Sequence, residues 1–186
     1  FNFGNISQVD FQLGSSNYLI AGFDFQVNIV ESQPEEILYG NQQMNNFGIF
    51  VQDQFKILKE SNGNSILAST IGMRADYNKL ISGSESFQLS PKISFVYSPK
   101  TTSRIFENTA WRLLAGRAFR NPSIAEIYFK KELFGGIEFI YNPDLQPEDM
   151  ISAEFGFRKQ YDNRFTFDFS LFYNYYNNLI QYVNVG

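Results

Sequence analysis

Acidic, basic and aromatic side chains are the groups in this sequence that could act on another molecule, because histidine and cysteine are both absent. Their absence excludes classical hydrolase triads, thiolate nucleophiles, and zinc or disulfide scaffolds. Two pairs of carboxylates, Glu35 with Glu36 and Glu148 with Asp149, have the residue types that glycosidases use. Adjacent residues of an extended chain point apart, so their spacing does not support catalysis. We therefore predict no enzyme, no metal site and no cofactor.

The segment from Arg120 to Asp149 is the better candidate for ligand contact, because a long loop in a compact architecture is often functional. Its aromatic and basic residues suit an anionic, partly aromatic ligand, since cations attract it and rings supply contact area. The alternative is that they only fold the loop back over the mouth of the fold. The candidate ligand-binding residues are Tyr128, Lys130, Lys131, Phe134, Phe139 and Tyr141.

A second candidate set consists of charged residues that fall on one parity of alternating segments, together with Gly, Ser and Thr. These residues could bind an internal partner, or they could only pair across neighbouring strands, where an opposite-charge pair contributes about 0.2–1 kcal/mol. As a set they mark the water-facing side of a sheet. They are Asp24, Arg74, Asp76, Arg112, Glu154, Arg158 and Asp168.

The elements that must position these side chains are long two-sided strands. Between Arg164 and Tyr176, Phe165, Phe167 and Phe169 alternate with polar residues, which is typical of a strand with one aromatic face. A strand of about 9–11 residues can cross a bilayer. The aromatic content of 18% favours an all-β fold. About eight strands are predicted, over residues 1–13, 17–30, 46–58, 65–78, 88–98, 107–119, 150–160 and 164–183.

Short and long connections alternate along the chain, as in an antiparallel up-and-down meander with tight turns at one end. Outer-membrane barrels have this asymmetry, with short periplasmic turns and long extracellular loops. Mean hydropathy of -0.25 and the lack of an 18-residue apolar run exclude a membrane-spanning helix but not a barrel. The net charge of -4, without a basic cluster, argues against nucleic acid. We predict a single segment of barrel wall over residues 1–186, with a long extracellular loop at about 120–149.

Two segments resemble the TonB-dependent outer-membrane receptors. They are GRAFRNPS at Gly116–Ser123 and NPDLQPED at Asn142–Asp149, the latter followed by ISAEFGFRKQ. The segment FGIFVQDQFKI at Phe47–Ile57 and the run from Tyr173 to Gln181 are also similar to the family pattern. Together and in order these motifs are fairly specific, and the similarity covers the chain from Phe3 onward.

The resemblance implies a wall segment of a 22-stranded barrel in the bacterial outer membrane. Such a receptor imports a scarce nutrient, for example an iron-siderophore complex. About eight strands cannot enclose a plug domain, because barrel width grows with strand number. We therefore expect an internal portion of a longer chain. Its implied partners are outer-membrane lipid, the missing strands and the plug, the imported ligand, and TonB through an absent N-terminal part. The charged set would then face the lumen and the plug.

Other functions remain open at this stage. The chain could be a self-contained small barrel that binds a hydrophobic ligand, or an outer-membrane adhesion or interaction module that uses exposed sheet edges. The orientation of the aromatic face separates them. A soluble carrier would enclose its phenylalanines and expose Arg158 and Asp168, whereas a membrane wall would turn the phenylalanines outward.

Overall fold

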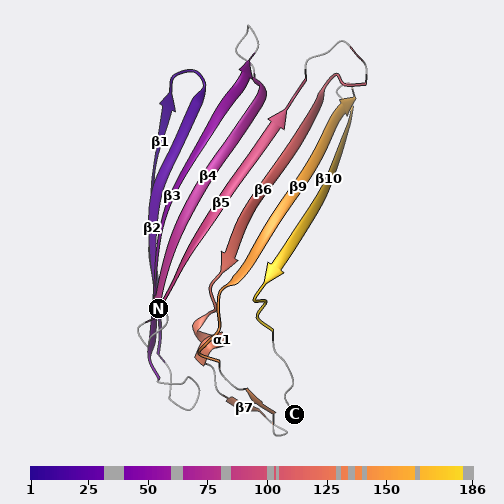
Figure 1. The fold of residues 1–186 in the computed structure, drawn as a ribbon. Helices are drawn as coiled ribbons and strands as arrows, with labels where there is room; N and C mark the ends of the chain where they lie inside the picture. Colours follow the sequence, from indigo (N-terminus) through magenta and orange to yellow (C-terminus); the bar gives the residue numbers. More distant parts are fainter. Residues whose placement is uncertain are drawn as a thin grey trace.

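The computed structural model describes residues 1–31, 40–59, 65–80, 85–99, 103, 105–128, 131–133, 137–139, 142–161 and 164–181. Within these residues, eight strands form one antiparallel sheet in the order β1-β2-β3-β4-β5-β6-β9-β10 (Figure 1). This confirms the predicted all-β meander. The strands are β1 (Asn2–Leu13), β2 (Asn17–Val30), β3 (Gln42–Lys59), β4 (Ser65–Leu80), β5 (Glu85–Tyr97), β6 (Thr109–Arg120), β9 (Glu148–Tyr161) and β10 (Phe165–Asn177).

Two strand boundaries differ from the predictions by more than three residues. β3 begins at Gln42 instead of residue 46, because its polar first residues pair with the end of β2 although they show no alternating polarity. β10 ends at Asn177 instead of residue 183. The next residue, Asn178, has a φ of 53°, a left-handed conformation that ends the strand.

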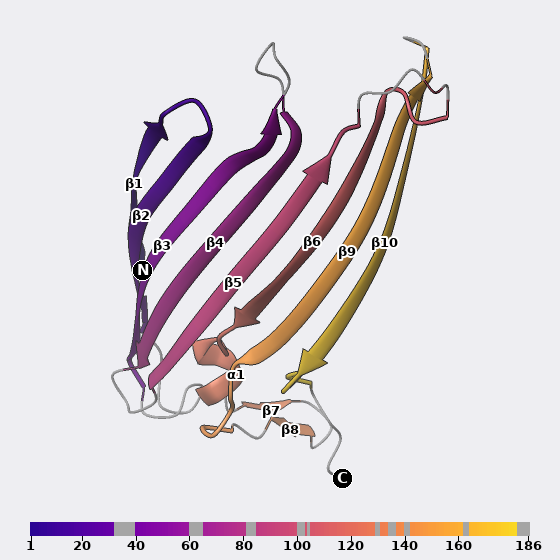
Figure 2. The same cartoon turned by 45° about the horizontal axis from the view of Figure 1, so that its top comes forward.

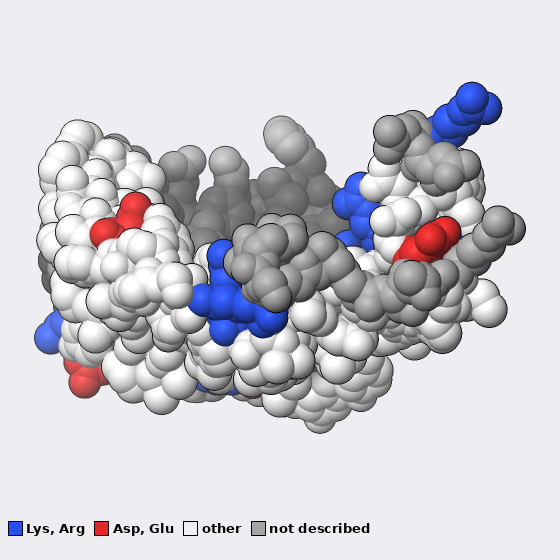
Figure 3. All heavy atoms as spheres, turned by 90° about the horizontal axis from the view of Figure 1, so that it is seen from above, with Lys and Arg blue, Asp and Glu red and all other residues white. Residues whose placement is uncertain are grey.

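The sheet is curved into an open trough when viewed end-on (Figure 3). Even-numbered side chains share one side over most of the sheet, and odd-numbered side chains share the other. On the even side, Asp24 and Asp76 are only 18% and 13% exposed, whereas Phe47 and Ile49 on the odd side are 48% and 51% exposed. Side chains crowd on a concave surface and spread on a convex one. We therefore call the even side the hollow face and the odd side the outer face.

The long connection between β6 and β9 contains elements that the sequence did not predict. They are a short helix, α1 (Ile124–Tyr128), and a hairpin of β7 (Lys131–Leu133) with β8 (Ile137–Phe139). Both lie at the end of the sheet where β6 stops and β9 starts (Figure 2). Among the described residues, no helix has the length and apolar character needed to cross a membrane.

The pairing between β5 and β6 is shorter than the lengths of these strands allow. Lys92–Tyr97 pair with Trp111–Gly116, whereas Arg117–Arg120 of β6 continue to pair with β9 on their other side. The ladder stops at Pro91, which has no backbone N–H to donate. The sheet therefore has a seam, defined here as the unpaired stretch between Glu85–Pro91 and Arg117–Arg120.

The sheet does not close on itself. β1 and β10 lie at its two edges, and among the described residues each pairs with a single neighbour. The described structure is thus a section of wall and not the self-contained small barrel considered as an alternative.

Candidate functional site on the hollow face

Three of the predicted charged residues form one network on the hollow face. Arg74 of β4 donates to Asp24 of β2 at 2.7 and 3.1 Å. Its Nε also donates to both carboxylate oxygens of Asp76 at 2.9 Å. One guanidinium therefore joins two carboxylates and spans β3, with the geometric specificity that its fixed fork of donors provides.

Glycines on the hollow face make room for these long side chains. A Cβ at Gly48 would overlap the guanidinium of Arg74, and one at Gly156 would lie 2.7 Å from Nε of Arg112. Lys92 lies over Gly72 in the same way. The glycines on the hollow face thus lack the side chains that would displace these long charged residues from the surface of the sheet.

A second ion pair connects β6 with β10. Nη2 of Arg112 donates to Oδ1 of Asp168 at 2.8 Å and lies 3.4 Å from the hydroxyl of Ser170. Glu154 is half-buried and acts on Arg112 through its charge. Arg158 is directly opposite Asp168 in the register, but it is exposed and forms no ion pair with the described residues. The predicted set is therefore split into two separate networks, with Arg158 outside both.

A polar cavity of about 290 Å³ lies between the first network and the start of the long loop. Asp24, Arg74 and Asp76 line it from the sheet, and Asn121 and Ser123 line it from the loop. Its walls offer carboxylate, guanidinium, amide and hydroxyl groups. They can hydrogen-bond a polar molecule, but they contain no arranged nucleophile and base.

The loop is anchored to the sheet by Arg120, the last residue of β6. Arg120 donates to both oxygens of Glu126 in α1, at 2.9 and 3.0 Å, and its Nε donates to Glu148 of β9 at 2.6 Å. Ser123 and Glu126 form a capping box: the amide of Ser123 donates to Glu126, and the amide of Glu126 donates to the hydroxyl of Ser123. The hydrogen bonds from Arg120, and then those from Ser123, lower the pKa of Glu126.

This anchor was missed in the sequence analysis, although a signal was present. Arg120 and Ser123 belong to the segment GRAFRNPS, and Glu148 belongs to NPDLQPED. These are the two segments on which the family resemblance depends. Because the two segments are far apart in the sequence, their contact in the structure could not be predicted from either segment alone.

α1 packs against the hollow face through a small buried core. Met44 and Leu80 from the sheet contact Ile124, Ile127 and Tyr128 from the helix, and all five are at most 6% exposed. Tyr128, a predicted ligand-binding residue, is thus placed in this core with 3% of its surface exposed. This placement corresponds to the alternative interpretation, in which the aromatic residue folds the loop back over the sheet.

The remaining loop candidates cannot be placed by their side chains. Lys130, Phe134 and Tyr141 lie outside the described residues. Lys131 begins β7 and Phe139 ends β8, and only their backbones are described. Their contact with a ligand remains a prediction. Among the described residues, no group of three or more acidic side chains is arranged to hold a metal ion.

The outer face carries most of the aromatic residues of the strands. Phe165, Phe167 and Phe169 are 60%, 45% and 46% exposed, and Trp111 packs against Phe157 with ring centroids 4.5 Å apart. Asp168 lies on the opposite face, in its pair with Arg112. The phenylalanines are therefore not enclosed in a dry interior, as a soluble carrier would require.

The family model for the TonB-dependent receptor-like β-barrel matches residues 1–186. The chain belongs to this family. The family is one of receptors and not of enzymes, and the chain is part of such a receptor barrel. No curated protein matches the sequence.

Solved receptor structures share the fold at low sequence identity. The siderophore receptor PirA of Pseudomonas aeruginosa is 15% identical, with a TM-score of 0.74 over 94% of this chain and 32% of PirA. The hemophore receptor HasR of Serratia marcescens, solved with its hemophore HasA and heme, is 16% identical, with a TM-score of 0.75 over 96% of this chain and 33% of HasR. The FrpB iron transporter of Neisseria meningitidis is 16% identical, with a TM-score of 0.67 over 93% of this chain and 27% of FrpB. The receptor barrel segment thus spans about a third or less of these proteins.

Proposed function

We propose that this receptor segment is a wall of a bacterial outer-membrane importer that takes up a scarce nutrient such as an iron-siderophore complex. The observation that carries the proposal is the division of the sheet into an apolar outer face and a charged, hollow inner face. In an outer-membrane barrel the apolar outer face contacts lipid and the charged inner face contacts water. The similarity to a siderophore receptor, a hemophore receptor and an iron transporter supports iron as the cargo.

In this arrangement the hollow face contributes polar contacts to the interior of the receptor. The two networks around Arg74 and Arg112 would meet the plug domain, and the polar cavity beside Ser123 would lie near the external opening. The loop anchored at Arg120 would face the outside, since it lies at the end opposite the short turns. Energy for import would come from TonB through a part of the receptor outside this chain.

Growth under iron limitation tests the proposal. The gene for the full receptor is deleted, and growth is measured on ferric siderophores and heme, each as the sole iron source, in strains with and without TonB. We expect the deletion to abolish growth on at least one source and TonB loss to reproduce that defect. Unchanged growth on every iron source, with reduced uptake of a glycan or cobalamin, would contradict iron import. Plasmid-borne wild-type receptor is the control.

A further inference from the structure

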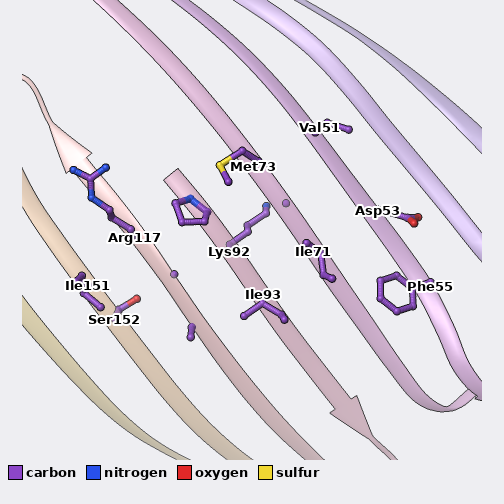
Figure 4. Close-up of a pocket in the computed structure, with 14 residues that line it drawn as sticks. Val51, Asp53, Phe55, Ile71, Met73, Lys92, Ile93, Arg117, Ile151 and Ser152 are labelled. Carbon is purple, nitrogen blue, oxygen red and sulfur yellow. The ribbon is translucent and has the colours of Figure 1, made fainter. Parts of the chain in front are cut away.

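An apolar groove of about 810 Å³ crosses the outer face from β3 to β9. Residues from five strands line it, and the close-up shows Met73, Ile71 and Ile93 between Asp53 on one side and Arg117 on the other (Figure 4). Most of the lining residues, and all of the large apolar ones, are odd-numbered, which places the groove on the face that we assign to lipid. Its apolar lining includes Val51, Phe55, Ile71, Met73, Ile93 and Ile151.

The seam between β5 and β6 explains why the outer face is hollowed here. The ladder between these strands ends at Lys92 and Gly116, and both residues border the groove. Ala115, beside them, has a side chain of one carbon and leaves the surface low. A flat, fully paired sheet with larger residues would have no such depression.

Three charged residues among those described line the groove: Asp53, Lys92 and Arg117. The side chain of Lys92 lies over Gly72 on the hollow face, and Arg117 is engaged within the protein. Its Nε contacts Oδ1 of Asp149 at 2.6 Å, its Nη1 donates to the carbonyl of Leu89 at 2.5 Å, and its Nη2 donates to Gln88 at 2.8 Å. The two bonds to Leu89 and Gln88 cross the seam from β6 to β5, whereas the contact with Asp149 joins β6 to β9. Arg117 is therefore not free to attract an anion.

Asp53 differs, because its charge is not compensated. Its Oδ2 accepts one hydrogen bond, from Asn17 at 2.9 Å, and its Oδ1 is buried without a hydrogen-bond partner. Among the described residues, no cation forms an ion pair with it. An ionised carboxylate can accept about four hydrogen bonds, and an uncompensated charge beside lipid is costly. The site thus calls for a cationic hydrogen-bond donor.

The position of Asp53 along the strands indicates which part of a lipid could supply this donor. Asp53 is opposite Leu19 in the register, and Phe55 is opposite Asn17, the first residue of β2. Asp53 is therefore close to the level of the short turn between β1 and β2, although β3 itself continues to Lys59. From Asp53 the apolar lining extends across β4, β5 and β6 to β9, which leaves room for an acyl chain beside the carboxylate.

We propose that the groove binds a phospholipid with a primary ammonium head group, with one acyl chain along the apolar lining and the ammonium at Asp53. A primary ammonium has three N–H donors, whereas the quaternary ammonium of phosphatidylcholine has none, and Asp53 repels the anionic phosphatidylglycerol. This inference rests on the proposed membrane placement.

Native mass spectrometry of the full receptor tests the proposal. Phosphatidylethanolamine, phosphatidylcholine and phosphatidylglycerol with the same acyl chains are titrated onto the delipidated receptor. We expect phosphatidylethanolamine to be retained about fivefold more tightly than the other two, the factor that corresponds to a partly exposed ion pair. Asp53→Asn should reduce this preference to less than about twofold. The control, Asp10→Asn, removes the same charge from the hollow face of β1 and should leave the preference unchanged.

A second variant tests the groove itself. Ala115→Phe fills the depression and should weaken binding of all three lipids equally, without changing the order. Equal retention of the three lipids by the wild type, or a preference that survives Asp53→Asn, would overturn the proposal, and so would a receptor dimer joined through the groove. Insertion of the wild type into phosphatidylcholine vesicles is measured separately. Failure to insert would contradict the membrane placement, whereas insertion without head-group preference would contradict only the lipid site.

Discussion

The packing of α1 on the wall can be tested by shortening one side chain, Leu80. Leu80 is 2% exposed and belongs to β4, and it lies in the core that Met44 forms with Ile124, Ile127 and Tyr128 of the helix. Leu80→Ala removes three carbons from the wall side of this contact and leaves the helix sequence and its capping box unchanged. The variant therefore weakens the docking of α1 without altering its intrinsic helix propensity.

The size of the effect follows from the burial of Leu80. Replacing a fully buried leucine by alanine costs about 2–5 kcal/mol, depending on how far the surroundings collapse. The core here is small and lies at one end of the sheet, so its residues can relax, and we expect about 2–3 kcal/mol. If this energy opposes undocking of α1, the population of the undocked state rises about 30- to 150-fold.

Hydrogen exchange of the full receptor, measured by mass spectrometry, reports the population of the state in which α1 is undocked. The amide of Ile127 donates to the carbonyl of Ser123 at 3.1 Å, and this bond exists only while the helix is formed. Its protection should fall by the factor above, while amides in the middle of β3 and β4 keep theirs. The matched control is Leu89→Ala, on the outer face, where Leu89 is 42% exposed.

Two results would refute the reasoning. If Leu80→Ala leaves exchange in α1 unchanged, the core does not hold the helix to the wall. If Leu80→Ala and Leu89→Ala increase exchange equally, the effect reflects general loosening of the sheet and not the loss of docking.

Two further predictions concern the ionic contacts. Gly48→Ala should displace Arg74 from Asp24 and lower the free energy of unfolding by about 1 kcal/mol, as measured by thermal unfolding. In the Asp24→Asn background the same substitution should have no such effect. The pKa of Glu126 is lowered in the folded receptor, so its contribution is fully present above the unfolded value near 4.5 and is lost as the pH falls through the lower folded value. Exchange in α1, corrected for its intrinsic pH dependence, should therefore stay constant from pH 5 to 8 and rise only below about pH 4. Arg120→Met should weaken this pH dependence, because Arg120 makes the largest contribution to the lowered pKa and the hydrogen bonds from Ser123 remain.

The strands could be predicted from the sequence because the alternation of polar and apolar side chains is a local property of each strand. The parity of Asp24, Arg74, Asp76 and Asp168 was enough to assign them to one face. Parity does not say which charges meet. Arg112 reaches Asp168 two strands away over Gly156, whereas Arg158 is the direct neighbour and forms no pair with the described residues.

The helix and hairpin within the long loop could not be predicted, for a different reason. α1 has only five residues, too few for a periodic pattern, and its position depends on contacts with Met44 and Leu80, which are distant in sequence. The capping box of Ser123 and Glu126 was a readable local signal. The seam was also marked by a local signal in the sequence, because a proline such as Pro91 within a strand pattern indicates lost pairing on one side.

The short ladder between β5 and β6 makes the wall mechanically uneven. A force that separates neighbouring strands is shared by the hydrogen bonds of the ladder between them, and here that ladder is confined to Lys92–Tyr97 and its partners. Every other strand junction in the described sheet extends over most of the length of its strands. Under a pulling force, β5 and β6 should therefore separate before any other pair of strands, leaving β1–β5 and the group of β6, β9 and β10 as two sheets. The hydrogen bonds from Arg117 to Leu89 and Gln88 would oppose this separation.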